Sequence, residues 1–371
     1  MNEKGKPKIC FVSMSSYPLL TGENTGYIGG AEQQLVYLAK ELSKRGYPVS
    51  FVTSGGHNQN IKKVARIDIL SAYSNNCDIS KLKKFLAFWK KLKEADADFY
   101  IFKLGIPPIV PLFGVIHRKI TIKIMASNNE ALKKDEIKGK RLNKIKNNLN
   151  IKLSNIVISQ NGFQKEKLKE NFGIDSVKIS NSIRTIPIDE FEKSEDYVLW
   201  VGTLRYVKQP DLFLDLAEKF PETKFMMIGG KGESEELFEK IKRRAEKIDN
   251  LDFKGFVPYD QIYDDYKKAM FLVNTSKLEG FPNTFLEAWM FGKPVVSLKV
   301  DPDEIICKYE LGFHSKSYSQ MVEDINTLLK NKKYRKQLGN ICRGYLEENH
   351  DIKKIADEYK KLLANLTDVK N

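Results

Sequence analysis

The chain has 371 residues, more than one typical hydrophobic core supports, which favours two domains of similar size. Its apolar content of 42% is ordinary for a globular protein, and because no run reaches about 18 apolar residues we expect no transmembrane helix. The four cysteines are scattered, form no metal-type pair and suit a reducing cytoplasm. They are Cys10, Cys77, Cys307 and Cys342.

The net charge of +14 is unevenly distributed. Residues 1–190 carry 32 Lys and Arg against 17 Asp and Glu, whereas residues 191–371 carry 30 against 31. A basic half attracts polyanions such as nucleic acid, an anionic membrane or a phosphorylated acceptor. A solvated lysine-rich surface explains the same charge, and the sequence leaves both interpretations open.

Strand and helix signals alternate through the first half. A predicted strand at Lys8–Met14 precedes an amphipathic helix at Gly30–Arg45, which stops at Gly46. Further strands are predicted at Pro48–Thr53, Phe99–Lys103, Thr121–Ala126 and Asn155–Ser159, with helices between them. This alternation implies a parallel sheet covered on both faces.

A second series of the same kind follows a polar segment at Ile183–Ser194, which we interpret as a linker. Its predicted elements are strand Tyr197–Val201, helix Pro210–Phe220, strand Lys224–Ile228, helix Glu233–Ile248, strand Leu251–Phe253, strand Met270–Ser276, helix Asn283–Phe291 and strand Lys293–Leu298. A last helix is predicted at His350–Leu366.

The predicted fold is therefore α/β, with two Rossmann-like doubly wound domains facing across a cleft. The predicted boundaries are 1–185 for the first domain, 195–349 for the second and 350–371 for the C-terminal helix. Ligands of such domains bind at the carboxyl ends of the strands.

The most informative motif is Glu279-Gly-Phe-Pro-Asn-Thr-Phe-Leu-Glu287. A strand, a tight turn and a helix N-terminus form an anion site, because backbone N–H groups and the helix dipole point at the ligand. A carboxylate within the helix can bind hydroxyl groups, and phosphate with hydroxyls is typical of a nucleotide sugar. A solvated Glu287 is the weaker alternative, since Leu286 and Ala288 flank it in an apolar helix.

Other glycine turns follow predicted strands. Gly29 and Gly30 open the first long helix, and Gly202 precedes two cations, Arg205 and Lys208, that could neutralise a diphosphate. Each turn alone is also explained as an ordinary loop, and the cations as solvated charges. Weaker turns occur at Ile228–Glu233 and Phe253–Pro258.

Together these motifs resemble glycosyltransferase family 4, which has the GT-B fold, over essentially the whole length. The paired glutamates, Glu279 and Glu287, are the strongest match. The resemblance implies that Glu287 binds the ribose hydroxyls and Glu279 the hydroxyls of the donor sugar. Lys208 would pair with the diphosphate, and the C-terminal helix would cross back to pack on the first domain. The remaining implied donor contacts are Gly29, Gly30, Gly202, Arg205, Phe256, Gly280, Phe281, Pro282, Asn283 and Thr284.

Two departures from that family stand out. The usual arginine after the glycine of the second motif is Thr203 here, and Arg205 would supply its charge. The first-domain histidine is absent from Met125–Asn129, where Ser127 or Asn128 could contact the acceptor instead.

The resemblance implies a retaining transfer of a hexose-type sugar from a UDP- or GDP-sugar to a glycan or lipid-linked acceptor in polysaccharide or glycoconjugate synthesis. Glu279, Lys208 and Arg205 would be the catalytic residues, with no metal and no cofactor besides the co-substrate. The leaving phosphate would take the proton of the acceptor.

A basic amphipathic helix at Lys81–Lys93 carries Phe85, Phe88 and Trp89, and Lys133–Lys146 adds a second basic stretch. Such a helix lies well on an anionic membrane surface, although most amphipathic helices pack on a core. We expect a cytoplasmic enzyme, peripheral on the inner face of the cell membrane.

Three other functions remain open at this stage. They are a non-catalytic nucleotide-sugar binder, a sugar-nucleotide epimerase or phosphorylase on the same fold, and a nucleic-acid-binding protein. The last explains the charge but not the paired glutamates, and we expect no nucleic acid as a partner.

Overall fold

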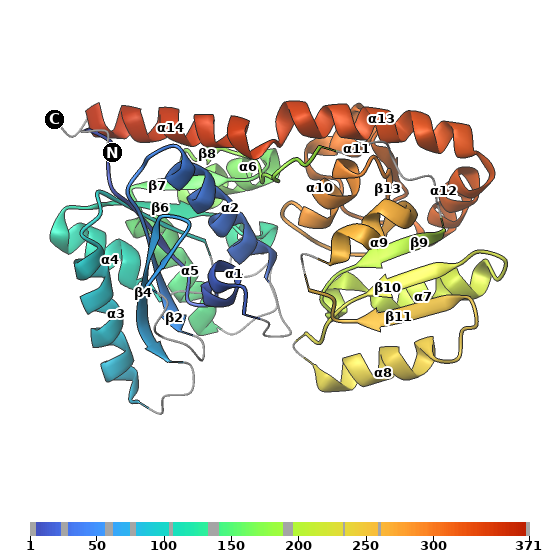
Figure 1. Ribbon diagram of the computed structural model, residues 1–371, viewed down its shortest axis with the longest axis horizontal. Coiled ribbons are helices and arrows are strands. Elements are labelled where there is room, and N and C mark those ends of the chain that lie inside the picture. Colours follow the sequence, from blue (N-terminus) through green and yellow to red (C-terminus); the bar gives the residue numbers. More distant parts are fainter. Residues whose placement is uncertain are drawn as a thin grey trace. The chain divides into compact units, whose positions relative to one another are not determined.

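The computed structural model describes residues 5–23, 29–55, 62–74, 79–103, 107–132, 141–187, 196–232, 234–258 and 261–368 (Figure 1). The chain divides into two compact units. Unit 1 is Met1–Ser182 with Ile352–Asn371, and unit 2 is Ile183–Asp351. Parts of the sequence motifs lie outside the described residues: Tyr27 and Ile28, Cys77, residues 133–140 and 188–194, and Glu233.

Unit 1 is built on a sheet whose described strands run in the order β3-β4-β2-β1-β5-β6-β7-β8. All of these pairings are parallel except that of β3 with β4. The strands are β1 (Ile9–Val12), β2 (Val49–Gly55), β3 (Lys63–Val64), β4 (Ile67–Ser74), β5 (Phe99–Phe102), β6 (Ile120–Ile124), β7 (Ile156–Ser159) and β8 (Val177–Lys178).

The helices of unit 1 cover both faces of this sheet (Figure 1). They are α1 (Tyr17–Thr21), α2 (Gly30–Lys44), α3 (Lys81–Ala95), α4 (Ile109–His117), the 3-10 helix η1 (Asn128–Ala131), α5 (Arg141–Leu153), α6 (Gly162–Phe172) and α14 (Ile352–Asp368). Local capping fixes several starts; for example, the Asn161 side chain accepts a hydrogen bond from the Gln164 backbone N–H at 2.8 Å.

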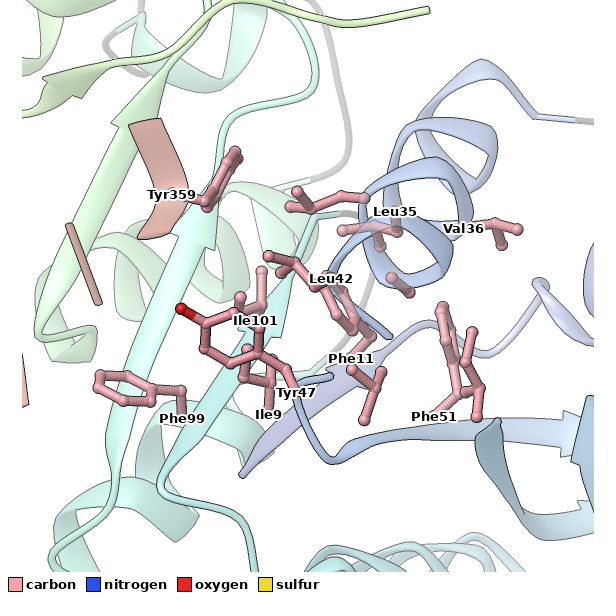
Figure 2. Close-up of a cluster of buried hydrophobic side chains, with 14 of the residues drawn as sticks. Ile9, Phe11, Leu35, Val36, Leu42, Tyr47, Phe51, Phe99, Ile101 and Tyr359 are labelled. Carbon is pink, nitrogen blue, oxygen red and sulfur yellow. The ribbon is translucent and has the colours of Figure 1, made fainter. Parts of the chain in front are cut away.

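Alternate residues of each strand in unit 1 face opposite cores, as a pleated sheet requires. Ile9 and Phe11 pack against Leu35 and Leu42 of α2 in one core, which Figure 2 shows. Cys10 and Val12 face the second core, together with residues of α3 and α4. The C-terminal helix α14 completes the first core through Ile355, Ala356, Tyr359 and Leu363.

Unit 2 contains a second sheet, in which the described strands run β11-β10-β9-β12-β13-β14, all parallel. They are β9 (Tyr197–Val201), β10 (Phe225–Ile228), β11 (Leu251–Gly255), β12 (Ala269–Asn274), β13 (Val295–Ser297) and β14 (Gly312–His314). The helices are η3 (Tyr206–Lys208), α7 (Pro210–Lys219), α8 (Glu235–Ala245), α9 (Ile262–Lys268), α10 (Asn283–Met290), η4 (Pro302–Glu304), α11 (Ile305–Lys308), α12 (Tyr318–Lys330) and α13 (Lys332–Asn349).

The strand orders confirm the predicted doubly wound architecture of each half. In unit 1 the order reverses between β1 and β5, and in unit 2 between β9 and β12. Ligands of doubly wound sheets bind beyond the carboxyl ends of the strands at such a reversal. A ligand site is therefore expected among the residues that follow these four strands.

The structure also contains strands that the sequence analysis did not predict. Strand β4 pairs with β2 and extends the sheet to β3 at its edge. Ile67 and Ile69 are buried on either side of exposed Asp68, an alternation that could have identified the strand. Within the described ranges, the helices are too short or too polar to cross a bilayer.

Candidate donor site

The loops after β9 and β12 meet at the strand reversal of unit 2, and backbone contacts tie them together. The Lys277 backbone N–H donates to the Val207 carbonyl at 2.8 Å, and the Thr275 hydroxyl donates to the Lys208 carbonyl at 2.7 Å. The indole N–H of Trp200 donates to the Thr275 hydroxyl oxygen at 3.0 Å. These contacts fix η3, and with it Lys208, beside the segment that begins the Glu279 motif.

Lys208 and Glu279, predicted separately from two motifs, form an ion pair. The Lys208 Nζ lies 2.6 Å from the Glu279 Oε1, with the side chains 19% and 13% exposed. The same oxygen accepts hydrogen bonds from the Ser276 hydroxyl at 2.7 Å and the Asn274 amide at 3.1 Å. The sequence analysis expected each partner to contact the donor, and it missed this pair together with Asn274 and Ser276.

The environment of Glu279 keeps its carboxyl ionised. Burial raises the pKa of this carboxyl, but the Lys208 ammonium and the hydrogen bonds from Ser276 and Asn274 outweigh that effect. The pKa therefore lies below its ordinary value. The pair places a cation and an anion side by side. The Lys208 ammonium can bind a diphosphate, and the Glu279 carboxylate can accept hydrogen bonds from sugar hydroxyls.

The turn after Glu279 leads directly into α10. Gly280, Phe281 and Pro282 are buried, and Pro282 occupies the N-cap position. Asn283 and Thr284 begin the helix and are partly exposed. The positive end of the helix dipole thus lies next to the turn, as the sequence predicted for an anion site.

Glu287 occupies the buried side of α10, with 5% of its surface exposed. The hydroxyl of Tyr266, a buried residue of α9, donates to the Glu287 Oε2 at 2.7 Å. Burial and the neighbouring carboxylate both raise the pKa of Tyr266, so this phenol remains a donor at neutral pH. Sequence reasoning named Glu287 and missed Tyr266, which lies 21 positions earlier without a motif around it.

The glycine turns of unit 2 serve close backbone packing. A Cβ at Gly229 would lie 2.4 Å from the Gly202 carbonyl oxygen, and one at Gly232 would lie 2.2 Å from that of Leu204. The Gly202 N–H donates to the Ile228 carbonyl at 3.0 Å, which joins the loops after β9 and β10. Exposed Arg205 follows on the first of these loops.

The loop after β11 joins the same edge. The Gly229 N–H donates to the Gly255 carbonyl at 2.8 Å, and Gly255 has a φ of +65°, a conformation that glycine adopts without strain. Phe256 follows immediately and is partly buried. Gly202, Arg205, Lys208 and Phe256 therefore lie on loops at one edge of the unit 2 sheet.

The predicted residues of unit 1 serve partly local roles. Gly29 is the N-cap of α2, and a Cβ there would lie 2.0 Å from the Glu32 carboxylate. Gly30 is the first residue of the helix. Asn128 accepts hydrogen bonds from the side-chain amides of Asn161 and Gln164, each at 3.1 Å, while Ser127 precedes η1 and is partly exposed.

Sequence reasoning missed Lys103, which follows β5 at the strand reversal of unit 1. Its side chain is buried, and its Nζ donates to the Asn181 Oδ1 at 3.1 Å. Burial lowers the pKa of Lys103 to about 7, with Glu130 opposing and Lys123 reinforcing the shift. Lys123 itself pairs with Glu130 at 2.6 Å. The sequence signal that could have identified Lys103 is its position directly after the apolar run Phe99–Phe102.

One group of potential metal ligands occurs among the described residues: Asp301, Cys307 and His314. The Asp301 carboxylate already accepts hydrogen bonds from the backbone N–H groups of Ile306 and Cys307. Burial and Asp301 raise the pKa of the Cys307 thiol, which opposes the thiolate that a metal would need. None of the three is a predicted donor-site residue.

Residues 182–344 match the family described as "Glycosyl transferases group 1". An uncharacterized glycosyltransferase of Haemophilus influenzae is 25% identical over 356 residues, covering 92% of this chain and 98% of that protein. A Campylobacter jejuni α-1,4-N-acetyl-D-galactosaminyltransferase, named for an undecaprenol-diphosphate-linked substrate, is 26% identical over 91% of this chain and 96% of its own.

Solved structures share the fold. Sucrose-phosphate synthase from Thermosynechococcus elongatus matches with a TM-score of 0.81 and 16% identity, covering 98% of this chain and all of that chain. Anabaena HepE, solved in complex with UDP-glucose, matches with a TM-score of 0.74 and 16% identity, covering 97% and 100%. The fold is that of the GT-B glycosyltransferases.

The matched segment contains Lys208, the Glu279 motif and α10, so the family assignment and the geometry agree on the same part of unit 2. Residues 182–344 thus match the group 1 glycosyltransferases, and the chain is a transferase with the GT-B fold.

Proposed function

We propose that this chain is a retaining, family 4 type glycosyltransferase, which moves a hexose-type sugar from a nucleoside diphosphate sugar to a glycan or lipid-linked acceptor. The observation that carries the proposal is the Lys208–Glu279 ion pair directly before the N-terminus of α10. Relatives named for O-antigen and amylovoran synthesis support a role in cell-surface polysaccharide or glycoconjugate synthesis.

In this proposal the donor lies at the carboxyl edge of the unit 2 sheet. Lys208 and Arg205 bind the diphosphate, with the backbone of the turn Gly280–Pro282 and the first residues of α10, Asn283 and Thr284. Glu279 binds hydroxyls of the sugar, and Glu287 binds the ribose. Gly202 and Phe256 line the nucleotide. A donor that binds between Lys208 and Glu279 exchanges their mutual contact for contacts with phosphate and hydroxyl groups.

Charge develops on the leaving diphosphate as the glycosidic bond breaks. Lys208, Arg205 and the dipole of α10 are preorganised cationic groups that stabilise this charge. They supply the electrostatic role that a divalent ion has in other transferases, so we propose a reaction without a metal. The acceptor oxygen attacks from the face that the leaving group vacates, and a leaving phosphate oxygen accepts its proton.

Thermal-shift measurements with UDP, GDP, ADP and dTDP, with and without EDTA, test the donor site first. We expect one diphosphate to stabilise the protein equally with and without the chelator, and Glu287→Ala to abolish that stabilisation. The matched control is Glu347→Ala, because the half-exposed carboxylate of Glu347 also forms an ion pair, with Arg343. No shift with any diphosphate, or a shift that requires a divalent ion, would contradict this site.

Turnover tests the catalytic assignments. Glu279→Ala and Lys208→Ala should each reduce sugar transfer by about 100-fold or more, because each removes a charge that the transition state needs. NMR of the product anomeric centre tests retention: an inverted centre would refute it. Conversion of the donor sugar to its epimer, without acceptor, would instead favour an epimerase.

The acceptor side belongs to unit 1 in this proposal, with Ser127 and Asn128 as candidate contacts. We propose that the enzyme works at the inner face of the cell membrane, because helix α3 is basic and amphipathic. Binding of a lipid-linked acceptor would require such a position, and the Campylobacter relative is named for an acceptor of that class.

A further inference from the structure

Exposed apolar side chains gather on three neighbouring helices of unit 1. Among the described residues, 14 large apolar side chains are exposed, and ten of them lie on α3, α4 and α5. We call these ten the three-helix face. They are Leu82, Phe85, Leu86, Leu112, Val115, Ile116, Leu142, Ile145, Leu149 and Leu153.

Each helix contributes one stripe to this face. The exposed residues recur at spacings of three and four along α3, α4 and α5, which places them on one side of each helix. Other residues of these helices are buried: Phe88 and Leu92 of α3 and Phe113 of α4 pack in the core beside the sheet. Ile151 of α5 is buried in a cluster with Met125, which follows β6, and Val157 of β7. The exposed stripes are therefore additional to the apolar residues that hold the helices on the core.

The stripes lie next to one another because α4 packs against both α3 and α5. Trp89 of α3 fixes the first contact: its ring lies 5.1 Å from that of Phe113 in an edge-on arrangement and 5.6 Å from that of His117. Trp89 also stacks on exposed Phe85 at 5.7 Å. The exposed apolar groups are therefore gathered on three helices that pack in series, whereas exposed apolar residues that lie singly need no explanation.

The charge on these helices is almost entirely positive. Their sequences contain ten Lys and Arg residues and one acidic residue, Glu94. Apolar side chains interspersed with lysines are complementary to a bilayer whose surface is anionic and whose interior is apolar. A soluble polyanion would satisfy the lysines but not Val115 and Ile116, and a core-packing role is excluded by their exposure.

We propose that the three-helix face docks unit 1 on an anionic lipid bilayer, with the apolar stripes of α4 and α5 entering the interface together with α3. The proposal rests on the lipid-linked acceptor of the proposed function for its purpose, and on exposure and charge for its evidence. It predicts that α4, which carries no lysine, contributes to binding as much as the basic helix α3.

Vesicle flotation of the full chain tests the proposal. Vesicles of phosphatidylcholine with 30% phosphatidylglycerol should bind more than about tenfold better than phosphatidylcholine alone, because several lysines lie near the surface. The variant Val115→Glu with Ile116→Glu should reduce binding to the anionic vesicles by at least about tenfold. Val177→Glu is the matched control, since this exposed valine is on β8 and is not part of the three-helix face, and the variant should bind within about twofold of the wild type.

A second measurement places the lipid. Acyl chains that carry bromine should quench the fluorescence of Trp89, and a Trp89→Phe variant should lose that quenching while still floating with vesicles. Trp200 and Trp289 are buried in unit 2 and provide the unquenched background. Wild-type binding without quenching would overturn insertion and leave only a charge interaction.

Three outcomes would overturn the docking proposal. They are vesicle binding by the Val115→Glu, Ile116→Glu variant equal to that of the wild type, no preference for anionic lipid, and stronger binding to RNA than to vesicles. Melting curves must first show that the double variant folds as the wild type does. Diphosphate-induced thermal shifts separate this failure from a failure of the donor site. If the protein binds a diphosphate but no vesicles, the proposed donor site stands and the membrane-docking proposal fails. If it binds vesicles but no diphosphate, the docking proposal stands and the donor site fails.

Discussion

The Lys208–Glu279 pair allows a sharp test of the site electrostatics without any substrate. Replacing Glu279 with Gln keeps an oxygen acceptor for Ser276 and Asn274 but removes the negative charge. Hydrogen bonds to charged groups contribute roughly 1.5–3 kcal/mol and neutral ones about 1 kcal/mol. Because the Lys208 contact is short and both side chains are mostly buried, we expect Glu279→Gln to lower the unfolding free energy of unit 2 by about 1–2 kcal/mol at pH 7.

The same substitution should change the acid dependence of stability. The pKa of Glu279 is lower in the folded protein than its ordinary value of 4.5. Its contribution is therefore complete above about pH 4.5 and is lost as the pH falls through the folded-state pKa. The difference between the wild type and Glu279→Gln should shrink on acidification below pH 4.5.

Urea unfolding followed by tryptophan fluorescence provides the assay. In a Trp89→Phe background the remaining tryptophans, Trp200 and Trp289, both lie buried in unit 2 and report on that unit. Glu347→Gln is the matched control, because its partner Arg343 lies at a similar 2.5 Å but the carboxylate is half exposed. Equal stability of wild type and Glu279→Gln at pH 7, or a difference that grows in acid, would refute the reasoning.

Three further predictions follow from the packing. Between pH 7 and 10.5 the unfolded chain binds a proton at Lys103 that the folded chain has released, so the unfolding free energy of unit 1 should rise with pH over this range. The substitution Lys103→Met should abolish this rise, which denaturant titration at both pH values measures. A rise that persists in the variant would contradict the prediction. Tyr266→Phe should cost about 1–3 kcal/mol of unit 2 stability, since it removes the Tyr266 hydrogen bond to the buried Glu287 carboxylate, and calorimetry that finds no change would show that the contact is dispensable. In α13, Gly344→Ala should stabilise unit 2 by roughly 0.5–1 kcal/mol, because the new Cβ would meet nothing within 4 Å. Gly339→Ala in the same helix should destabilise it, because the new Cβ would lie 2.2 Å from the Gly292 carbonyl oxygen. Melting temperatures in the reverse order would contradict this prediction.

The doubly wound fold of each half was predictable because strands such as Ile9–Val12 and Tyr197–Val201 are short apolar runs next to amphipathic helices. Glu279, Lys208 and α10 were identified for the same reason, since each follows a strand that the pattern marks. Tyr266 and Lys103 were not identified, because their roles depend on partners at Glu287 and Asn181 that are distant in sequence.

Pairwise contacts changed the interpretation of several predicted residues. The Gly29 position is explained by the Glu32 side chain packed against it, and Gly229 by the carbonyl of Gly202. Neither neighbour can be inferred from the motif alone, because a glycine required by protein packing and one required by a ligand have the same sequence. The ion pair between Lys208 and Glu279 was equally hidden, since 71 positions separate them.

Unit 1 is discontinuous along the chain, because α14 supplies Ile355, Ala356, Tyr359 and Leu363 to a core that begins at Ile9. During synthesis, all of unit 2 emerges from the ribosome before these residues do. The contiguous second unit can therefore complete its core first, and the unit that contains the N-terminus is the last to become fully folded. A nascent chain halted before Ile352 would leave exposed the apolar surface of unit 1 that α14 covers.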